Sequence, residues 1–284
     1  MFKEEDNYYF IEELRNLGIE ARYGNKNHGI EEIEKVTKIK KLIHGVQTHS
    51  SNIAIVDERI DLVKIPFQDC DGMITNRKDL LLYTKHADCL AIFFYDRVNK
   101  VIGICHSGWK GSFDEISKNL IDKMKIEYNS NLEDIIIGIG IGISKKNYEV
   151  DKKFYEMFKE KFQKNRCEKN LNISEKDTNE KDTNEKDINE KDINEKYTDT
   201  DIDEKNLNEK KDILEVLMGE SFEFNEGKIY FDNEKFNFHL FRSYGVKKEN
   251  IILSNLCTYE DEKFNSYRKT GKSSGRNLAY MYIK

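Results

Sequence analysis

Apolar residues in the first half of the chain gather in short runs that have the length of β-strands. Five such runs lie at residues 52–56, 80–83, 90–95, 101–105 and 135–137. Runs of this length, rich in Ile and Phe and bounded by polar residues, are typical of buried strands. The polar connector Asp96–Lys100 is short enough for a hairpin, so we expect the strands on either side of it to be antiparallel neighbours.

Apolar spacing of three or four residues predicts helices elsewhere in the chain. Ser112–Glu115 has the pattern of a capping box, and Ile116, Leu120 and Met124 follow at four-residue spacing, which predicts a helix that starts at Ser112. Further amphipathic helices are predicted at residues 10–14, 151–162 and 233–244, the last ended by Gly245. Strands and helices without a regular βαβ alternation favour an α+β fold of mixed, largely antiparallel β-sheets with flanking helices.

A repetitive segment separates two blocks of the chain. From Glu175 a five-residue unit, Glu-Lys-Asp-Thr/Ile-Asn, occurs four times, and a period of five matches neither one helix face nor one strand face. The unit has at most one apolar side chain, so ordering it would cost backbone entropy with little surface buried in return. We therefore expect residues 167–211 to be a disordered low-complexity insertion, with residues 1–166 and 212–284 forming a single domain.

Charge is concentrated in the same segment. Between Glu168 and Lys211 there are 15 acidic and 9 basic residues, which accounts for the whole net charge of −6. The rest of the chain is neutral, which excludes a generally basic nucleic-acid binder. No apolar stretch reaches the about 18 residues that a membrane span needs, and the N-terminus lacks the basic-then-apolar order of a secretion signal. We expect a soluble, cytoplasmic protein with no nucleic-acid or membrane partner.

Cysteine usage favours reduced thiols. The five cysteines are Cys70, Cys89, Cys105, Cys167 and Cys257. They are sparse, odd in number and show no CxxC pair, so neither a disulfide framework nor a structural zinc site with paired cysteines is expected.

Three segments at the ends of predicted strands carry side chains that bind metals and take part in catalysis. They contain His49, Cys89 and His106. Two imidazoles and one thiolate form the ligand set of a catalytic zinc with a fourth, open position. The spacing alone leaves other roles open, because a histidine at a strand end often makes a structural hydrogen bond, and a cysteine beside an apolar run is often a core thiol.

Other pairs of donors compete with this triad. His44 lies five residues before the first histidine of the triad, His86 lies three residues before its cysteine, and Cys105 directly precedes its second histidine. An odd spacing in an extended strand puts side chains on opposite faces, which disfavours His86 and Cys105 as partners of the triad residues nearest to them.

The chain resembles a known family in seven ordered motifs. The motifs are Gln47–His49, Asp71–Thr75, Ala87–Cys89, His106–Gly111, Ile143–Val150, Cys257–Tyr259 and Phe264–Arg268 with Gly275 and Arg276. The family has long been labelled multicopper polyphenol oxidoreductase, or laccase-like, and is now regarded as zinc-dependent purine nucleoside phosphorylases with adenosine deaminase activity. The motifs span almost all of the chain outside the insertion, and their shared order is far more specific than any one of them.

The resemblance implies that His49, Cys89 and His106 bind Zn²⁺ and form the catalytic centre. It also implies that the partners are small molecules, namely phosphate and a purine nucleoside such as adenosine, inosine or S-methyl-5′-thioadenosine. The chain departs from the family at Lys110, where Arg is common, and at residues 140–143, which lack the usual proline. Neither departure falls on an implied metal ligand.

Four further residues are candidates for binding substrate or phosphate. Lys110 adds positive charge beside the predicted helix start at Ser112, where free backbone N–H groups favour an anion. Arg268 and Arg276 suit bidentate contacts with phosphate, although surface ion pairing is an equally good role for both. Asp71 lies close in sequence to the site elements, where a carboxylate orients a ligand imidazole or accepts a proton, although Asp residues more often cap turns.

Three alternatives to a zinc phosphorylase stay open. Cu²⁺ accepts the same donors, but six histidines without a His-x-His pair are few for a copper-dependent polyphenol oxidase. A cysteine hydrolase would use Cys89 as its nucleophile and a histidine as its base. A non-enzymatic metal-binding scaffold would use the repeat as an interaction arm, so deleting the repeat would abolish its function.

Overall fold

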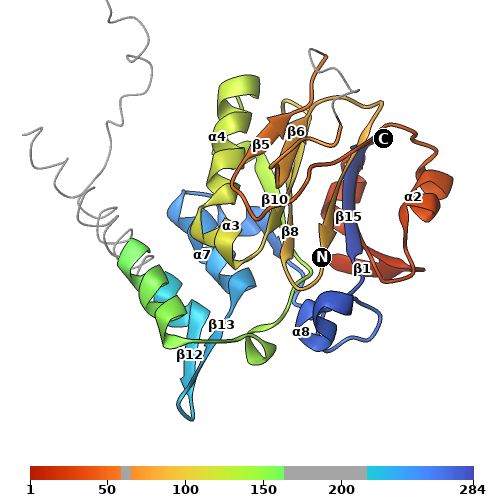
Figure 1. Cartoon of the computed structure of the whole chain (residues 1–284). Coiled ribbons are helices and arrows are strands. Elements are labelled where there is room, and N and C mark those ends of the chain that lie inside the picture. Colours follow the sequence, from red (N-terminus) through yellow and green to blue (C-terminus); the bar gives the residue numbers. More distant parts are fainter. Residues whose placement is uncertain (59–64, 163–215) are drawn as a thin grey trace, which may run out of the picture.

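The computed structural model describes residues 1–58, 65–162 and 216–284. The predicted insertion at 167–211 lies outside the described residues, so the insertion and the single domain predicted around it stay predictions. Two six-stranded sheets lie at the centre of the molecule and a three-stranded sheet lies beside them (Figure 1). Mixed, largely antiparallel sheets with helices around them confirm the predicted α+β fold.

The first sheet joins the two ends of the chain. Its strands, in spatial order, are β1 (Phe2–Glu5), β2 (Tyr8–Ile11), β3 (Ile19–Gly24), β15 (Asn277–Ile283), β7 (Leu81–His86) and β4 (Leu42–Ile43). Strand β15 lies in the middle, antiparallel to both β3 and β7. Because Asn277 pairs with His86, β15 brings the segment that contains Arg268 and Arg276 to the end of β7.

The second sheet contains the predicted hairpin. Its strands, in spatial order, are β14 (Ile251–Leu253), β10 (Ile135–Gly140), β8 (Leu90–Asp96), β9 (Val101–Ser107), β6 (Gly72–Thr75) and β5 (Ile53–Ile55). Strands β8 and β9 are antiparallel, and the Asp96 carboxylate closes their turn by accepting the backbone N–H groups of Val98 and Asn99 at 2.8 and 2.9 Å. The hairpin is therefore confirmed, and the five predicted strands are present as β5, β7, β8, β9 and β10.

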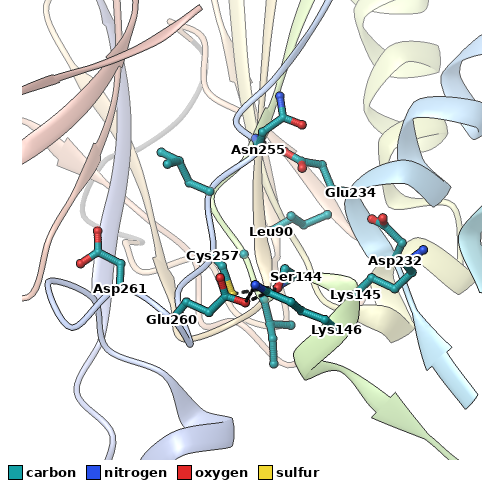
Figure 2. A pocket seen from close by; sticks show the side chains of 13 residues that line it. Leu90, Ser144, Lys145, Lys146, Asp232, Glu234, Asn255, Cys257, Glu260 and Asp261 are labelled. Atoms are coloured by element: carbon teal, nitrogen blue, oxygen red, sulfur yellow. Dashed lines mark hydrogen bonds and ion pairs between the residues drawn. The ribbon is translucent and has the colours of Figure 1, made fainter. Parts of the chain in front are cut away.

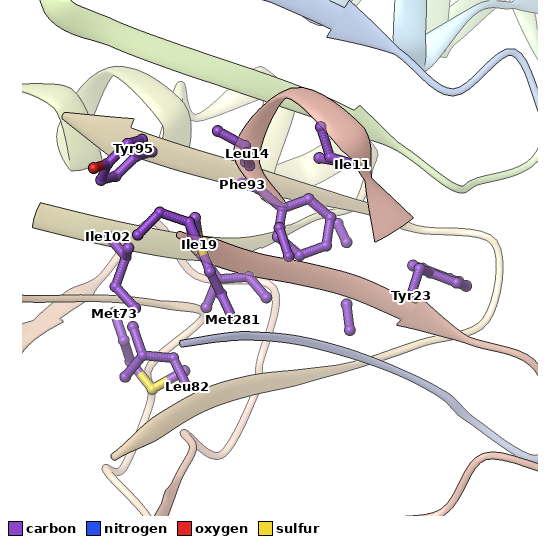
Figure 3. Packing of buried hydrophobic residues seen from close by; sticks show 14 of the residues in the cluster. Ile11, Leu14, Ile19, Tyr23, Met73, Leu82, Phe93, Tyr95, Ile102 and Met281 are labelled. Atoms are coloured by element: carbon purple, nitrogen blue, oxygen red, sulfur yellow. The ribbon is translucent and has the colours of Figure 1, made fainter. Parts of the chain in front are cut away.

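The two large sheets pack face to face and bury the main apolar core (Figure 3). Tyr23, Leu82 and Met281 contribute from the first sheet, and Phe93 and Ile102 from the second. Each fully buried side chain of this kind stabilises the fold by about 1.5–3 kcal/mol. Strand β8 is buried along its whole length, because helices cover the outer face of its sheet, and this explains its continuous apolar sequence.

Helices cover the outer faces of both large sheets (Figure 1). Helix α2 (Ile30–Thr37) places Ile33 in the apolar cluster on the first sheet. Helices α4 (Ile116–Tyr128) and α7 (Asn233–Ser243) contribute to the apolar cluster on the second sheet. The molecule is thus a pair of central sheets between outer helical layers.

The third sheet forms an aromatic lobe beside the second. Its strands are β11 (Glu149–Val150), β13 (Lys228–Phe231) and β12 (Phe222–Asn225), in the order β11-β13-β12. Helical residues 152–162 and 216–221 pack against it through a cluster that includes Phe154, Phe158, Phe222, Phe231 and Phe236. The helices predicted at 151–162 and 233–244 are confirmed, the second as α7.

The predicted helix at residues 10–14 is wrong in its first part. Phe10 and Ile11 belong to strand β2, and helix α1 (Glu12–Asn16) starts only after them. Phe10 pairs with Lys3 on one side and with Arg22 on the other. Pairing on both edges of β2 overrides the weak local helix preference of this segment.

The helix predicted through Ile116, Leu120 and Met124 is present as α4, but its predicted start at Ser112 is wrong. Helix α3 (Trp109–Phe113) begins three residues earlier, and Glu115, with φ of 54°, separates it from α4. The Ser112 hydroxyl donates to Asn233 Oδ1 at 2.7 Å and contacts the Ser107 hydroxyl at 2.9 Å. These contacts with α7 and β9 replace the capping box, so tertiary hydrogen bonds decide the geometry here.

Short helical turns complete the described part of the chain. They are α8 (Tyr267–Thr270) and the 3-10 turns Leu132–Asp134, Lys145–Asn147, Lys248–Asn250 and Gly271–Ser273. Within residues 1–58, 65–162 and 216–284, no helix has the length and apolar character that crossing a bilayer requires.

Replacing Glu20 by glutamine is expected to lower the free energy of unfolding by about 3 kcal/mol, because it leaves a buried guanidinium without its counter-charge. Glu20 is 1% exposed, and its carboxylate accepts from Arg22 at 2.7 Å, from Arg15 at 3.1 Å and from Lys284 at 2.5 Å. Denaturant titration measures the difference. Glu12→Gln, which breaks the exposed pair with Lys3, serves as the control with an expected effect below about 0.5 kcal/mol.

The Glu20 contribution is expected to depend on pH. Burial raises the pKa of this carboxyl, but hydrogen bonds from Arg22 and Lys284 outweigh burial and lower the pKa below its usual value. A lowered pKa in the folded state gives stability that is present above the unfolded pKa of about 4.3 and is lost as the pH falls. The difference between wild type and Glu20→Gln should therefore shrink below about pH 4; a constant difference down to acid pH would contradict this assignment.

Candidate metal centre

Three separate elements bring His49, Cys89 and His106 together. His49 lies in the loop between β4 and β5, Cys89 in the turn between β7 and β8, and His106 near the end of β9. One donor atom from each side chain lies within 4.8 Å of the other two. Among the described residues this is the one group of three His, Cys or acidic side chains with such a geometry. We call these three side chains the donor group.

The donor group fits a zinc ion. Cys89 Sγ and His49 Nε2 are 3.9 Å apart. Tetrahedral zinc with ligands at about 2.0–2.3 Å requires donor separations of roughly 3.3–3.8 Å, so small side-chain movements suffice. Thiolate and imidazole are preferred zinc ligands, and three protein donors leave one tetrahedral position for water or substrate. Copper also accepts these donors, so the donor chemistry alone leaves the metal open.

Asp71 holds two members of the donor group in place. Its Oδ1 accepts from His106 Nδ1 at 2.8 Å and from the His49 backbone N–H at 3.2 Å. Its Oδ2 accepts from the backbone N–H groups of Thr48 and Ser50 and from the Ser50 hydroxyl, all at 2.9–3.0 Å. The carboxylate is fully buried. Because Nδ1 of His106 donates to Asp71, its Nε2 is left as the nitrogen that binds a metal.

The loop that carries His49 is also fixed from the other side. The Gln47 side-chain amide pairs with the Lys85 backbone through two hydrogen bonds of 2.8 Å, one to the carbonyl and one from the N–H. His49 itself has φ of 62°, in the left-handed region, so its position depends on these flanking contacts. The loop therefore presents the imidazole from a backbone held by both β7 and Asp71.

Electrostatics in the donor group favour a thiolate. Burial raises the pKa of the Cys89 thiol, but the positive charge of His106 and hydrogen bonds from both histidines outweigh burial and lower this pKa to about 6. Burial lowers the pKa of His106, but the charges of Cys89 and Asp71 outweigh it and raise the pKa to about 9. The thiolate is the form of cysteine that binds metals.

His86 and Cys105 take no part in the donor group. His86 is buried, with Nδ1 3.1 Å from the Cys89 carbonyl and Nε2 2.7 Å from the Thr84 hydroxyl. Burial, together with the charge of His106, holds the pKa of His86 well below its usual value, so this imidazole is neutral. Cys105 is fully buried in the apolar cluster on the outer face of the second sheet.

A cavity of about 730 Å³ opens over the donor group, and we call it the main cavity. Besides the donor group and the backbone around it, its lining residues include His44, Lys85, Asp88, Trp109, Ile143, Tyr148, Asn233, Tyr267, Arg268 and Arg276. Apolar and aromatic walls with a few polar groups are typical of sites for small organic molecules. The lining contains three Lys or Arg side chains and one carboxylate, so the cavity is positively charged in a chain with a negative net charge.

The four predicted substrate or phosphate residues occupy different places. Arg268 and Arg276 line the main cavity, whereas Asp71 lies behind the two histidines. Lys110 is exposed and is not among the residues that line the cavity. The backbone N–H of Ser112 donates to the Gly108 carbonyl inside the short helix α3, so the expected free N–H groups at Ser112 are not present.

Asp88 connects the cysteine of the donor group to the opposite wall of the cavity. Its carboxylate accepts from the Thr258 hydroxyl at 2.7 Å and from the Arg268 backbone N–H at 2.6 Å. The Arg268 guanidinium donates twice to the Glu149 carbonyl at 3.2 Å and lies 5.3 Å from the centre of the Tyr148 ring. Asp88 and Arg268 thus shape the wall that faces the donor group.

Sequence reasoning did not assign a role to several lining residues. Tyr148 and Tyr267 lie within two of the seven motifs. Their place in those motifs could have indicated a role in the site. Lys85 and Asn233 lie outside the motifs. An isolated lysine or asparagine gives no local signal, because such residues are ordinarily solvated.

Figure 2 shows a second cavity, of about 580 Å³. Its lining includes Ile143, which also lines the main cavity. Its lining also carries lysines, but both have carboxylate partners. Lys146 pairs with Glu260 at 2.8 Å and Lys145 with Glu223 at 2.6 Å. The second cavity therefore offers no unpaired lysine, and its lining carries more acidic residues than lysines, unlike the main cavity.

Comparison with known proteins decides the family. A family model described as multi-copper polyphenol oxidoreductase laccase matches residues 23–208 and 201–284. The chain belongs to this family. This membership confirms the resemblance that the seven motifs indicated.

Three individual proteins are similar to this chain, two in sequence and one in structure. A protein of Borreliella burgdorferi named purine nucleoside phosphorylase is 30% identical over 245 residues, which cover 86% of this chain and 81% of the relative. A protein of Rickettsia prowazekii with the same kind of name is 34% identical over 160 residues, covering 53% of this chain and 64% of the relative. The crystal structure of the Bacillus licheniformis hypothetical protein YfiH superposes with a TM-score of 0.71 at 21% identity, covering 100% of this chain and 99% of that one.

Proposed function

We propose that the chain is a zinc-dependent purine nucleoside phosphorylase. It cleaves adenosine, inosine or S-methyl-5′-thioadenosine with phosphate into the free base and the sugar 1-phosphate, and it also deaminates adenosine. The observation that carries the proposal is the donor group of His49, Cys89 and His106 under a positively charged cavity. The name of the Borreliella relative supports the substrate class.

The three residues of the donor group would hold the zinc, which when bound supplies Lewis acidity that activates water near neutral pH. The other tasks fall to the chain's own residues. Asp71 keeps the His106 imidazole in one tautomer and one orientation. Trp109 and Tyr148 offer aromatic surface to a purine. The cations of the cavity attract phosphate.

A copper-dependent polyphenol oxidase is less well supported, although the family description names that activity. All six histidines of the chain lie among the described residues, and three of them are committed elsewhere. His28 contacts the Tyr280 hydroxyl at 2.9 Å, His239 contacts Glu220 at 3.2 Å, and His86 contacts the Thr84 hydroxyl. Too few imidazoles are therefore left near the donor group for a cluster of several coppers.

Removing the metal is expected to abolish both proposed reactions. Protein treated with a strong chelator should release ribose 1-phosphate and inosine from adenosine at less than about 1% of the untreated rate, because the donor group alone cannot supply Lewis acidity. One equivalent of zinc should restore both products, which mass spectrometry identifies with and without phosphate.

Two outcomes would contradict the assignment. Full turnover of rigorously zinc-free protein would favour a hydrolase with Cys89 as nucleophile. Recovery only with copper, together with oxidation of a phenol, would favour the oxidase.

A further inference from the structure

We propose that Lys85 and Arg276 form a subsite for a phosphate group at one end of the main cavity, set apart from the donor group. The assignment of inorganic phosphate as its occupant rests on the proposed function. The existence of an anion subsite rests on the placement and charge of these two side chains. We call the pair the cationic pair.

Strand register puts the cationic pair on one face of the first sheet. Lys85 of β7 pairs with Leu278 of β15, and Arg276 precedes Leu278 by two residues. Directly paired residues point to the same side of a sheet, as do residues two apart. The His44 ring packs on Tyr83 at 4.7 Å, two residues before Lys85, so it joins the same face. Lys85, Arg276 and His44 all line the main cavity.

Neither member of the cationic pair has a carboxylate partner among the residues that the structure describes. Arg276 Nη1 donates to the carbonyls of Ser274 and Gly275 at 2.8 and 2.9 Å, which orient the guanidinium without neutralising it. The lysines of the second cavity, by contrast, are paired with glutamates, as Figure 2 shows for Lys146. Two unneutralised cations at a cavity wall favour an anionic ligand.

The other charged groups of the main cavity are already engaged. The Asp88 carboxylate accepts from the Thr258 hydroxyl with one oxygen and from the Arg268 backbone N–H with the other, and no ion pair joins it to either member of the cationic pair among the described residues. The Arg268 guanidinium is held by the Glu149 carbonyl. Burial, with a contribution from the charge of Lys85, lowers the pKa of His44, so this imidazole is neutral near pH 7 and adds no positive charge beside the cationic pair.

Separation from the donor group suits the two proposed reactions. Lys85 lies on the face of β7 opposite to His86, whose ring is 5.2 Å from that of His106. In adenosine, the carbon that bears the amino group and the sugar carbon C1′ lie on opposite sides of the purine. One bound nucleoside therefore presents its base to the donor group and its sugar to the cationic pair.

The phosphorolysis step balances with phosphate in this subsite. A phosphate oxygen forms a bond to C1′ while the bond from C1′ to N9 breaks. The electron pair of the broken bond goes to the purine, which takes up a proton from phosphate or water. The cationic pair stabilises the phosphate anion while it is held against the sugar.

The test compares Lys85→Gln and Arg276→Gln with Lys125→Gln, a control on the exposed side of α4 outside the cavity lining. Each cavity variant should raise the KM for phosphate by about tenfold or more, as expected for the loss of a charge-assisted contact. The ratio of phosphorolysis to deamination should fall by a similar factor, because water replaces phosphate in deamination. Zinc content, measured by mass spectrometry, should match wild type, and Lys125→Gln should keep the wild-type KM for phosphate.

A second arm distinguishes free phosphate from the phosphate of a nucleotide. Calorimetry measures binding of inorganic phosphate, adenosine and adenosine 5′-monophosphate to wild type and to both cavity variants. Weaker phosphate binding in the variants supports inorganic phosphate as the occupant. A wild-type preference for the nucleotide over adenosine that both variants lose supports the same subsite with a nucleotide as its source.

The proposal is overturned if both variants keep the wild-type KM for phosphate and bind all three ligands as wild type does. Failure of the proposed function gives a different result. Wild type that binds phosphate through the cationic pair but produces no ribose 1-phosphate would contradict the phosphorylase assignment and support the anion subsite.

Discussion

Alanine in place of Cys89 is expected to remove the zinc and to lower both phosphorolysis and deamination by about a thousandfold or more. The thiolate is the anionic member of the donor group, and the two imidazoles beside it favour it over the thiol although burial opposes it. Without the thiolate, two neutral imidazoles hold a divalent ion weakly. Metal content per chain and the rate of product formation, measured on the same sample, check both parts of the expectation.

The matched control for this prediction is Cys257→Ser. Cys257 is also a free thiol, but its Sγ accepts the Ser144 N–H at 3.2 Å in the second cavity, outside the donor group. A serine oxygen keeps that acceptor, so metal content and rate should stay near wild type. His49→Ala and His106→Ala should lose metal as Cys89→Ala does while staying folded by circular dichroism. Retention of zinc and of the wild-type rate by Cys89→Ala would show that the ligand assignment is wrong.

Local pattern predicted the centre of the fold well, because that centre is defined by continuous apolar runs. Strands β8 and β9 are buried along their whole length, so their sequences carry a strong signal. The strand β15 was not predicted, although Leu278–Ile283 is a continuous apolar run. Glu226 and Gly227 both have positive φ, as the tight turn of a β-hairpin requires. This pair in the sequence could therefore have predicted the hairpin of β12 and β13.

Predictions that depended on local capping or propensity failed where tertiary contacts compete. The Ser112 hydroxyl bonds to Asn233, which is more than a hundred residues away in the chain. Phe10 pairs with two neighbouring strands. A short window of the sequence shows neither set of partners, so the local pattern could not predict the strand at Phe10 or the earlier helix start before Ser112.

The three members of the donor group were predictable as residues, whereas their meeting in space was not. His49, Cys89 and His106 come from three elements, and their distances depend on the register of β7, β8 and β9. The seven motifs supplied the grouping through family resemblance, and the fold supplies the geometry. Lys85 and Arg276 show the limit of the approach, because their proximity follows only from the pairing of β7 with β15.

Replacing Asp71 by asparagine is expected to weaken zinc binding by about 10- to 100-fold and to lower turnover at limiting zinc by a similar factor. The carboxylate accepts five hydrogen bonds, from His106 Nδ1, from three consecutive backbone N–H groups and from the Ser50 hydroxyl. An amide of the same shape turns an NH₂ group toward donors, so part of this set is left without an acceptor. Chelator competition measures the zinc affinity directly.

The control for Asp71→Asn is Asp69→Asn, a substitution close to the same loop. Asp69 is exposed and accepts from Asn52 Nδ2 at 2.8 Å, but it does not contact an imidazole. Asp69→Asn should therefore bind zinc as wild type does. Added zinc should restore much of the turnover of Asp71→Asn, because the donor atoms are still present and only their orientation is lost. Wild-type zinc affinity in Asp71→Asn would contradict a positioning role, and a loss that zinc does not rescue would assign Asp71 to folding alone.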